Sequence, residues 1–141
     1  MPTRKANAQW QGDLKSGKGN MALESGAYEG QFSFKTRFED GTDTNPEELV
    51  GAAHAGCFSM QFSAMLAEAG HPPDSIKTEA RVHFAVEDTP TIERIELITR
   101  GKVPGIDEAE FKKTADKAKE MCPVSRLYTG AEITLDATLE S

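Results

Sequence analysis

The sequence of 141 residues predicts an α+β fold in which antiparallel sheets pack around one long, buried central helix. The first observation is a run without Asp, Glu, Lys or Arg at residues 49–67, in a chain of which 28% of the residues are charged. The second is the grouping of one-faced strand patterns before and after this run, which favours antiparallel pairing over repeated parallel units. Because a helix that is apolar all round is usually buried, the run is the expected centre of the core.

The part before this helix predicts three strands. Turn-rich polar strands are expected around residues 6–10 and 17–23. Residues 31–38 alternate between aromatic and polar side chains, which predicts a third strand with one apolar face. The aromatic residues on that face are Phe32, Phe34 and Phe38. Arg37 then lies near the end of this strand with the opposite parity, which on sequence alone predicts a side chain facing solvent.

The charge-free run lies in a helix with clear start and stop signals. Thr44 or Asn45 can cap the helix ahead of Pro46, a residue that suits the first helical position. Two acidic residues in the first turn, Glu47 and Glu48, interact favourably with the positive end of the helix dipole and so support a helix start here. Gly70, which two prolines follow, predicts that the helix ends near Ala69.

Four further elements are expected after this helix. Alternating apolar residues predict strands at residues 76–86, 93–103 and 132–140. Between the last two strands, an amphipathic helix capped by Asp107 is expected to end at Cys122, because a proline follows that residue.

Charge and hydropathy exclude several classes of protein. A formal net charge of −7 opposes the phosphate backbone of nucleic acid and an anionic membrane surface. A mean hydropathy of −0.51, with polar residues interrupting the apolar run, favours a soluble core helix over a membrane span. The length suits a single domain over residues 1–141. The polar N-terminus has no apolar signal stretch, so a cytoplasmic location is expected.

Burial of the central helix predicts a homodimer. A sheet with one apolar face can cover one side of residues 49–67, and the short chain has little left to cover the other side. Two copies that pack these helices together would solve the problem.

The two cysteines differ in their surroundings and together suggest a redox site with two thiols. Cys57 lies inside the charge-free run, whereas Cys122 precedes a proline at the end of a polar helix. Cytosolic thiols are kept reduced, so two cysteines there indicate chemistry more than a structural disulfide. A lone Cys57 in a core helix would more often be structural, and the second cysteine motif reverses that expectation.

The segments around both cysteines are TNPEEL at residues 44–49, which continues through AAHAGCFSM at residues 52–60, and CPVS at residues 122–125. They resemble the first and the second cysteine motif of the OsmC/Ohr family of thiol-dependent hydroperoxide reductases. The segments at residues 103–107 and 131–135 are more similar to the OsmC branch, the osmotically inducible proteins, and the resemblance covers essentially the whole chain.

The resemblance implies an intertwined homodimer with no metal, flavin or haem. Its implied activity is the reduction of organic hydroperoxides, and more weakly of hydrogen peroxide, in defence against oxidative or osmotic stress. By the match of motifs, Cys57 is the peroxidatic thiol, Cys122 the resolving thiol, and Arg37 with Glu47 the pair that activates the thiolate. The implied reductant is a dithiol of the lipoyl type, either free dihydrolipoamide or a lipoylated protein.

The chemistry explains why these residue types are needed. A thiolate attacks the peroxide, and an ordinary buried thiol needs a nearby cation to ionise. Arg37 can supply this charge and hold the peroxide oxygens, and Glu47 can fix the guanidinium by a bidentate contact. The sulfenic acid left on Cys57 then condenses with Cys122 before further oxidation can trap it.

The spacing of Glu47 and Cys57 adds a constraint. They are ten positions apart, which is roughly 15 Å along a continuous helix. Glu47 must therefore act through a long Arg37 bridge, through a broken first turn or from the other subunit. The last route agrees with the dimer, so a site shared between subunits is the working hypothesis.

Other interpretations stay open beside this one. The chain could be a non-catalytic thiol redox sensor or a small-molecule binding protein on the same fold. It could also be a structural zinc module in which His54 joins both cysteines, although a fourth ligand is not evident. The expected role of His54 is otherwise packing or a hydrogen bond beside the site. Apolar residues near Cys57 could line a slot for an alkyl chain, although core packing is expected for most of them: Phe58, Met60, Phe62 and Met65.

Overall fold

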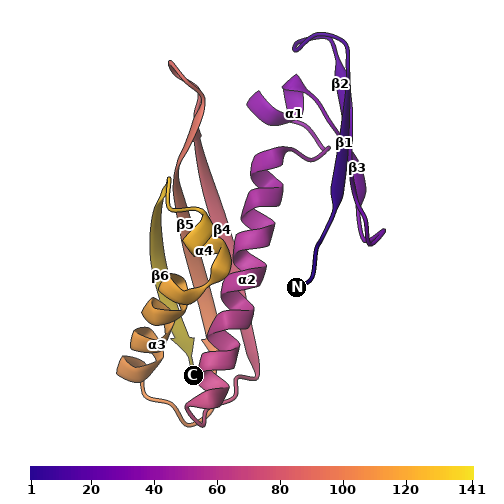
Figure 1. Cartoon of the computed structure of the whole chain (residues 1–141). Coiled ribbons are helices and arrows are strands. Elements are labelled where there is room, and N and C mark those ends of the chain that lie inside the picture. The colour runs from indigo at the N-terminus through magenta and orange to yellow at the C-terminus, as the bar shows by residue number, and fades with distance from the viewer. The chain divides into compact units, whose positions relative to one another are not determined.

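The computed structural model describes all 141 residues, and the chain separates into two compact units, Met1–Leu49 and Val50–Ser141. Along the chain come three strands, a short helix, a long helix, two strands, two helices and a last strand (Figure 1). The strands form two sheets of three strands each. The predicted α+β class is confirmed.

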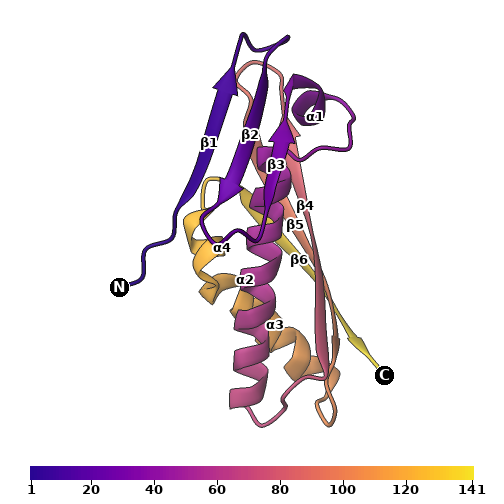
Figure 2. The same ribbon diagram turned by 90° about the vertical axis from the view of Figure 1, so that its right-hand side faces the viewer.

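The first unit contains a small antiparallel sheet in the order β1-β2-β3 (Figure 2). Its strands are β1 (Ala6–Gln11), β2 (Lys18–Leu23) and β3 (Glu29–Phe32). Trp10 on β1 and Phe32 on β3 are both paired with Gly19 of the central strand, and their ring centroids are 5.4 Å apart. A Cβ atom at Gly19 would lie 2.6 Å from each ring, so only glycine leaves room for the two aromatic side chains.

The predicted third strand is wrong beyond Phe32, because the chain turns there into the short helix α1 (Phe34–Phe38). Ser33 caps this helix by accepting a hydrogen bond from the backbone N–H of Thr36, and the Thr36 hydroxyl accepts one from the Ser33 N–H at 2.8 Å. This reciprocal capping box outweighs the aromatic alternation that predicted a strand. Arg37 therefore lies on α1, and the strand-parity argument for a solvent-facing side chain does not apply.

The predicted long helix is confirmed as α2 (Pro46–Glu68). Asn45 caps it, since its Oδ1 atom accepts a hydrogen bond of 2.7 Å from the backbone N–H of Glu48. Beyond its last turn, Gly70 adopts a φ of 93°, the left-handed conformation expected of a stop signal. α2 is one unbroken helix, so the broken first turn considered for Glu47 is excluded.

The sheet of the second unit has the order β4-β5-β6, and its strands are β4 (Ser75–Ala85), β5 (Thr91–Lys102) and β6 (Glu132–Glu140). β4 and β5 are antiparallel, as predicted. β5 and β6 are parallel, so the expectation of purely antiparallel sheets is wrong for this pair. The helices between β5 and β6 form the crossover that parallel neighbours require.

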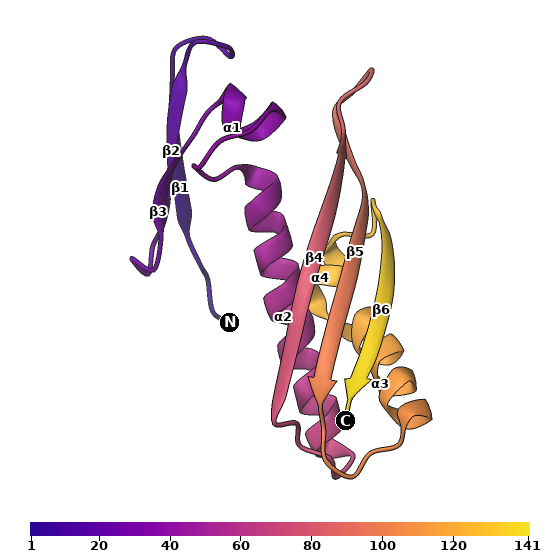
Figure 3. The same ribbon diagram turned by 180° about the vertical axis from the view of Figure 1, so that it is seen from behind.

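These crossover helices are α3 (Glu108–Met121) and α4 (Pro123–Leu127). Asp107 caps α3 as predicted, whereas α4 was not predicted. In Figure 3 the three strands lie in front of α3, α4 and the part of α2 that belongs to this unit, so the helices cover one face of the sheet. The buried apolar core between them consists of Phe58, Phe62, Leu66, Ile95, Leu97, Val103, Phe111, Ala115, Ala118 and Cys122.

Helix α2 is buried along one face only in the single chain, as expected of a helix that one sheet covers on one side. Its side chains Phe58, Phe62 and Leu66 are fully buried. On another face of the helix, Ala53, Gly56, Met60, Ala64 and Ala67 are exposed. By length and composition alone α2 is also the one helix that could cross a membrane, a test that core helices of soluble proteins pass as well.

Candidate active site

The structure brings the two cysteines together from positions 65 residues apart. Their Sγ atoms lie 3.0 Å from each other, and both cysteines are free. Cys57 projects from α2 and is partly exposed, whereas Cys122 is fully buried. The pair therefore consists of one thiol that a small reagent can reach and a second, buried thiol in contact with it.

Cys122 is held at the junction of two helices. Its backbone N–H donates to the carbonyl of Ala118 in the last turn of α3, at 2.9 Å. Its own carbonyl accepts from the N–H of Arg126 in α4, at 3.0 Å. At Cys122 itself the backbone is extended, with φ −57° and ψ 123°, as expected of a residue before proline. The proline that ends α3 thus also favours this extended backbone at Cys122.

A second contact joins α2 to the same segment. His54 lies three residues before Cys57, and Ser125 lies three residues after Cys122. His54 Nε2 and Ser125 Oγ form a buried hydrogen bond of 2.7 Å, and the His54 ring packs edge-on against Tyr128. Burial lowers the pKa of His54, which keeps its ring neutral near pH 7. The hydrogen bond expected for His54 beside the site is confirmed, whereas its partner was not predicted.

The surroundings of Cys57 within its own unit favour the protonated thiol. Burial, followed by the hydrogen bond with Cys122, raises the pKa of the Cys57 thiol. A backbone hydrogen bond from Val124 opposes this shift and is the weaker influence. None of these groups is a cation, so ionisation of Cys57 at neutral pH requires positive charge from elsewhere.

Arg37 and Glu47 form an ion pair inside the first unit. Arg37 Nε lies 3.2 Å and 3.3 Å from the two carboxylate oxygens of Glu47, and Nη2 lies 3.0 Å from Oε2. The Glu47 side chain is 10% exposed and the Arg37 side chain 38% exposed. The carboxylate is therefore the buried anchor, and the guanidinium keeps part of its surface accessible.

The loop before α2 ties the two partners of this ion pair together. The Asn45 side-chain amide donates to the carbonyl of Thr36 on α1 at 3.0 Å, while its Oδ1 caps α2. The backbone N–H of Thr44 donates to the carbonyl of Gln31 on β3 at 3.2 Å. Asn45 thus forms hydrogen bonds with both α1, which carries Arg37, and α2, which carries Glu47. These contacts set the position of Glu47 relative to Arg37.

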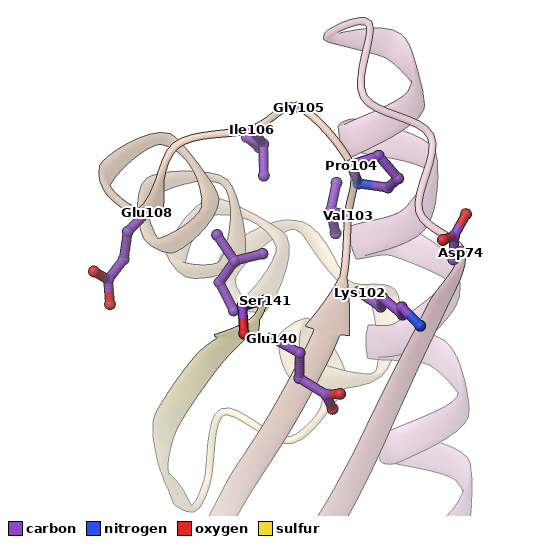
Figure 4. A pocket seen from close by; sticks show the side chains of 10 residues that line it. Asp74, Lys102, Val103, Pro104, Gly105, Ile106, Glu108, Glu140 and Ser141 are labelled. Atoms are coloured by element: carbon purple, nitrogen blue, oxygen red, sulfur yellow. The ribbon is translucent and has the colours of Figure 1, made fainter.

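A different pocket of about 440 Å³ lies where β5 and β6 end and α3 begins (Figure 4). Its lining includes the charged residues Asp74, in the turn before β4, Lys102 on β5 and Glu108 on α3. None of the four predicted site residues lines this pocket.

Comparisons with known proteins agree with the motifs. Residues 39–137 match the family model for OsmC-like protein. Peroxiredoxin OsmC of Escherichia coli is 50% identical over 140 residues, which cover 98% of this chain and 97% of that protein. The organic hydroperoxide resistance protein of Xanthomonas axonopodis pv. citri is 33% identical over 103 residues, 70% of this chain and 67% of that protein.

Solved structures show the same fold at low sequence identity. An organic hydroperoxide resistance protein from Elizabethkingia anophelis matches with a TM-score of 0.78 at 20% identity, over 99% of both chains. An OsmC-like protein from Mycoplasma pneumoniae matches with a TM-score of 0.77 at 14% identity, again over 99% of both chains. With the family model covering most of its length and a relative half identical to it, the chain belongs to the OsmC-like protein family.

Proposed function

We propose that this protein is a thiol-dependent peroxidase that reduces organic hydroperoxides and, more weakly, hydrogen peroxide. Membership of the OsmC-like family supports a peroxidase-type enzyme with an antioxidant role in stress response, since its relatives are named peroxiredoxin and organic hydroperoxide resistance protein. The observation that carries the mechanism is the 3.0 Å contact between the two thiols, of which only Cys57 is partly exposed.

In the first step the Cys57 thiolate attacks the terminal oxygen of the hydroperoxide. The O–O bond breaks, the S–O bond forms, and the leaving alkoxide takes a proton to become the alcohol. Cys57 is left as a sulfenic acid. The partial exposure of Cys57 and the full burial of Cys122 support this order of roles, because the peroxide must reach the thiol that reacts first.

In the second step Cys122 attacks the sulfenic sulfur of Cys57. The S–S bond forms and the hydroxyl leaves as water. The Sγ atoms of Cys57 and Cys122 are 3.0 Å apart. Atoms that are positioned to react usually lie roughly 3–3.5 Å apart, so this distance is at the short end of that range. A dithiol of the lipoyl type, as dihydrolipoamide or a lipoylated protein, then exchanges with the disulfide and restores both thiols while forming its own cyclic disulfide.

Arg37 and Glu47 are the proposed activating pair. The pKa of Cys57 is raised within its own unit, so a cation must offset the cost of ionisation. Arg37 is charged at any working pH, and the bidentate contact with Glu47 orients its guanidinium in advance. We place this pair at the thiol of the partner subunit, in a site shared across a homodimer.

The exposed face of α2 supports the homodimer. It consists of small or flexible apolar residues, and Met60 at its centre is 79% exposed. Small residues let two helices approach closely, and a second copy would cover the apolar surface. Met60→Lys should therefore shift the protein from dimer to monomer in sedimentation velocity, whereas Val86→Lys, a change at an exposed residue just beyond the end of β4, should not. A dimer that survives the Met60 change at micromolar concentration contradicts this interface.

The location proposed is the cytoplasm, with residues 1–141 acting as one functional domain. Reducing conditions there would keep both cysteines in the thiol form between turnovers, as the mechanism requires.

The test is consumption of cumene hydroperoxide with dihydrolipoamide as reductant, measured for the parent, Cys57→Ser and Cys122→Ser. The parent should turn over, Cys57→Ser should be inert, and Cys122→Ser should react once without recycling. A parent that reacts once and recycles with no dithiol supports the alternative of a thiol sensor. Activity that persists in Cys57→Ser contradicts the mechanism.

A further inference from the structure

We infer that the thiols of Cys57 and Cys122 form a chelating site for trivalent arsenic compounds that carry one organic group. The inference goes beyond the proposed function, because no peroxide takes part and neither sulfur is oxidised. It is based on the contact of 3.0 Å between the two Sγ atoms, both of which belong to free cysteines. We call this pair the dithiol site.

The number of donor atoms narrows the class of ligand. Cysteine sulfur is a soft ligand that selects soft, thiophilic elements over hard cations such as Mg²⁺ or Ca²⁺. No group of three or more His, Cys, Asp or Glu side chains in the structure is arranged to hold a metal ion. His54, one turn before Cys57, already uses its Nε2 atom in the hydrogen bond with Ser125. Structural zinc takes four ligands, so the dithiol site suits a ligand that needs two sulfurs.

The distance between the two sulfurs narrows the class again. A two-coordinate ion such as Hg²⁺ binds its sulfurs on opposite sides of the metal, which keeps them far apart. Trivalent arsenic is pyramidal, so it binds two sulfurs side by side, and the carbon of the organic group fills its third position. Two Sγ atoms 3.0 Å apart match the pyramidal arrangement.

The two thiols differ in exposure, which gives the order of the reaction. Cys57 is partly exposed and Cys122 is fully buried, so an arsenical of the form R–As=O meets Cys57 first. An As–S bond forms, and the thiol proton passes to the oxygen. Cys122 then forms the second As–S bond, and the hydroxyl leaves with the second thiol proton as water. Arsenic stays trivalent throughout, so the reaction needs no oxidant or reductant.

The fold brings the second thiol close to the first. Cys57 and Cys122 are 65 positions apart, so an unfolded chain must close a long loop before the second bond can form. In the folded chain, hydrogen bonds of the Cys122 backbone with Ala118 and Arg126 hold the buried thiol beside Cys57. A tethered second thiol should raise the apparent affinity about 10²–10⁴-fold over a single thiol.

The probe for the test is phenylarsine oxide, added in equimolar amount to the reduced parent protein. Intact mass spectrometry should show one phenylarsenic group per chain, and thiol titration should show the loss of both thiols. The group should resist glutathione, a monothiol, and should leave with the dithiol 2,3-dimercaptopropanol. In competition with glutathione, the apparent affinity should be about 10²–10⁴-fold weaker in Cys57→Ser and in Cys122→Ser. A parent that loses the group to glutathione as readily as Cys122→Ser overturns the inference.

Two controls test whether the folded dithiol site is responsible. His54→Gln changes the other potential ligand beside Cys57 and should retain the group as the parent does. Weaker retention in this variant would require a nitrogen ligand and overturns the site of two sulfurs. The parent in urea should retain the group less well than the folded parent, because loop closure then opposes the second bond. Equal retention in urea overturns the role of the fold, and this comparison uses the parent alone, so it stays decisive if a cysteine variant does not fold.

The dithiol site and the proposed function can fail separately, since binding of phenylarsine oxide is measured without peroxide. A protein that retains the group through both sulfurs and never turns over cumene hydroperoxide keeps the dithiol site and loses the proposed function. A protein that turns over cumene hydroperoxide and releases the group to glutathione keeps the function and loses the dithiol site.

Discussion

Replacing Ser125 by alanine should destabilise the protein and slow the closure of the disulfide. Ser125 Oγ is the hydrogen-bond partner of His54 Nε2, at 2.7 Å, and His54 Nδ1 is already buried without a partner. Ser125→Ala therefore leaves a fully buried imidazole with no hydrogen bond. Leaving a buried polar group unpaired costs about 1–3 kcal/mol. For a chain of this length the melting temperature should fall by roughly 3–10 °C.

The same change loosens the segment that carries Cys122. The contacts between Cys57 and Cys122 and between His54 and Ser125 both join α2 to this segment, and only the second is independent of the sulfur chemistry. Without it, Cys122 should reach the sulfenic acid more slowly, and a larger fraction of Cys57 should oxidise further to sulfinic acid.

Two measurements test this prediction. Circular dichroism gives the melting temperature, and mass spectrometry gives the ratio of sulfinic acid to disulfide after a limited dose of peroxide. Ser125→Thr is the matched control, because it keeps the hydroxyl and should lie close to the parent in both. A melting temperature of Ser125→Ala within about 1 °C of the parent, with an unchanged ratio, would refute the role assigned to the hydrogen bond.

Three further predictions concern the core, the ion pair and pH. Phe62→Ala should lower the free energy of unfolding in urea by about 3–5 kcal/mol, because Phe62 is fully buried between the rings of Phe58 and Phe111. Glu47→Gln removes the charged partner of Arg37, and kcat/KM for cumene hydroperoxide should fall at least about tenfold with little change in melting temperature. Because burial lowers the pKa of His54 in the folded state, the unfolded state binds more protons below about pH 6.5. The free energy of unfolding should therefore decrease as the pH falls from 7.5 to about 5.5, and His54→Gln should show a shallower decrease.

Elements whose signals are local could be predicted from the sequence. The start of α2 depends on Asn45 and its end on Gly70, and both act within a few residues of the helix. Helix α1 was missed because the alternation of aromatic residues was given more weight than the capping pair Ser33 and Thr36. The parallel direction of β6 was missed because it depends on the path of the crossover helices, which strand patterns do not describe.

The residues of the candidate site likewise separate into those that have a local sequence signal and those that do not. Cys57 and Cys122 could be chosen because the chain has two cysteines, each within its own motif, and the structure places them in contact. Arg37 was assigned to the end of a strand that in the structure stops at Phe32, yet its ion pair with Glu47 is present. Ser125 could not be assigned, since its partner His54 lies 71 positions away and no local pattern links them.

In the proposed site, Cys57 and Arg37 come from different units, and the raised pKa of Cys57 makes the reactivity of this thiol depend on Arg37. Within residues 50–141 the thiol is held in its protonated form by burial and by the neighbouring thiol. Arg37 belongs to the other unit and is bound to the buried Glu47, so its charge is oriented by contacts that do not involve the thiols. Under the proposal, only a Cys57 that receives this guanidinium ionises at neutral pH, and the receiving thiol already has Cys122 Sγ at 3.0 Å. In the proposed mechanism, separate parts of the chain therefore supply activation and protection against further oxidation, and a thiol that lacks the guanidinium stays protonated and reacts slowly with peroxide.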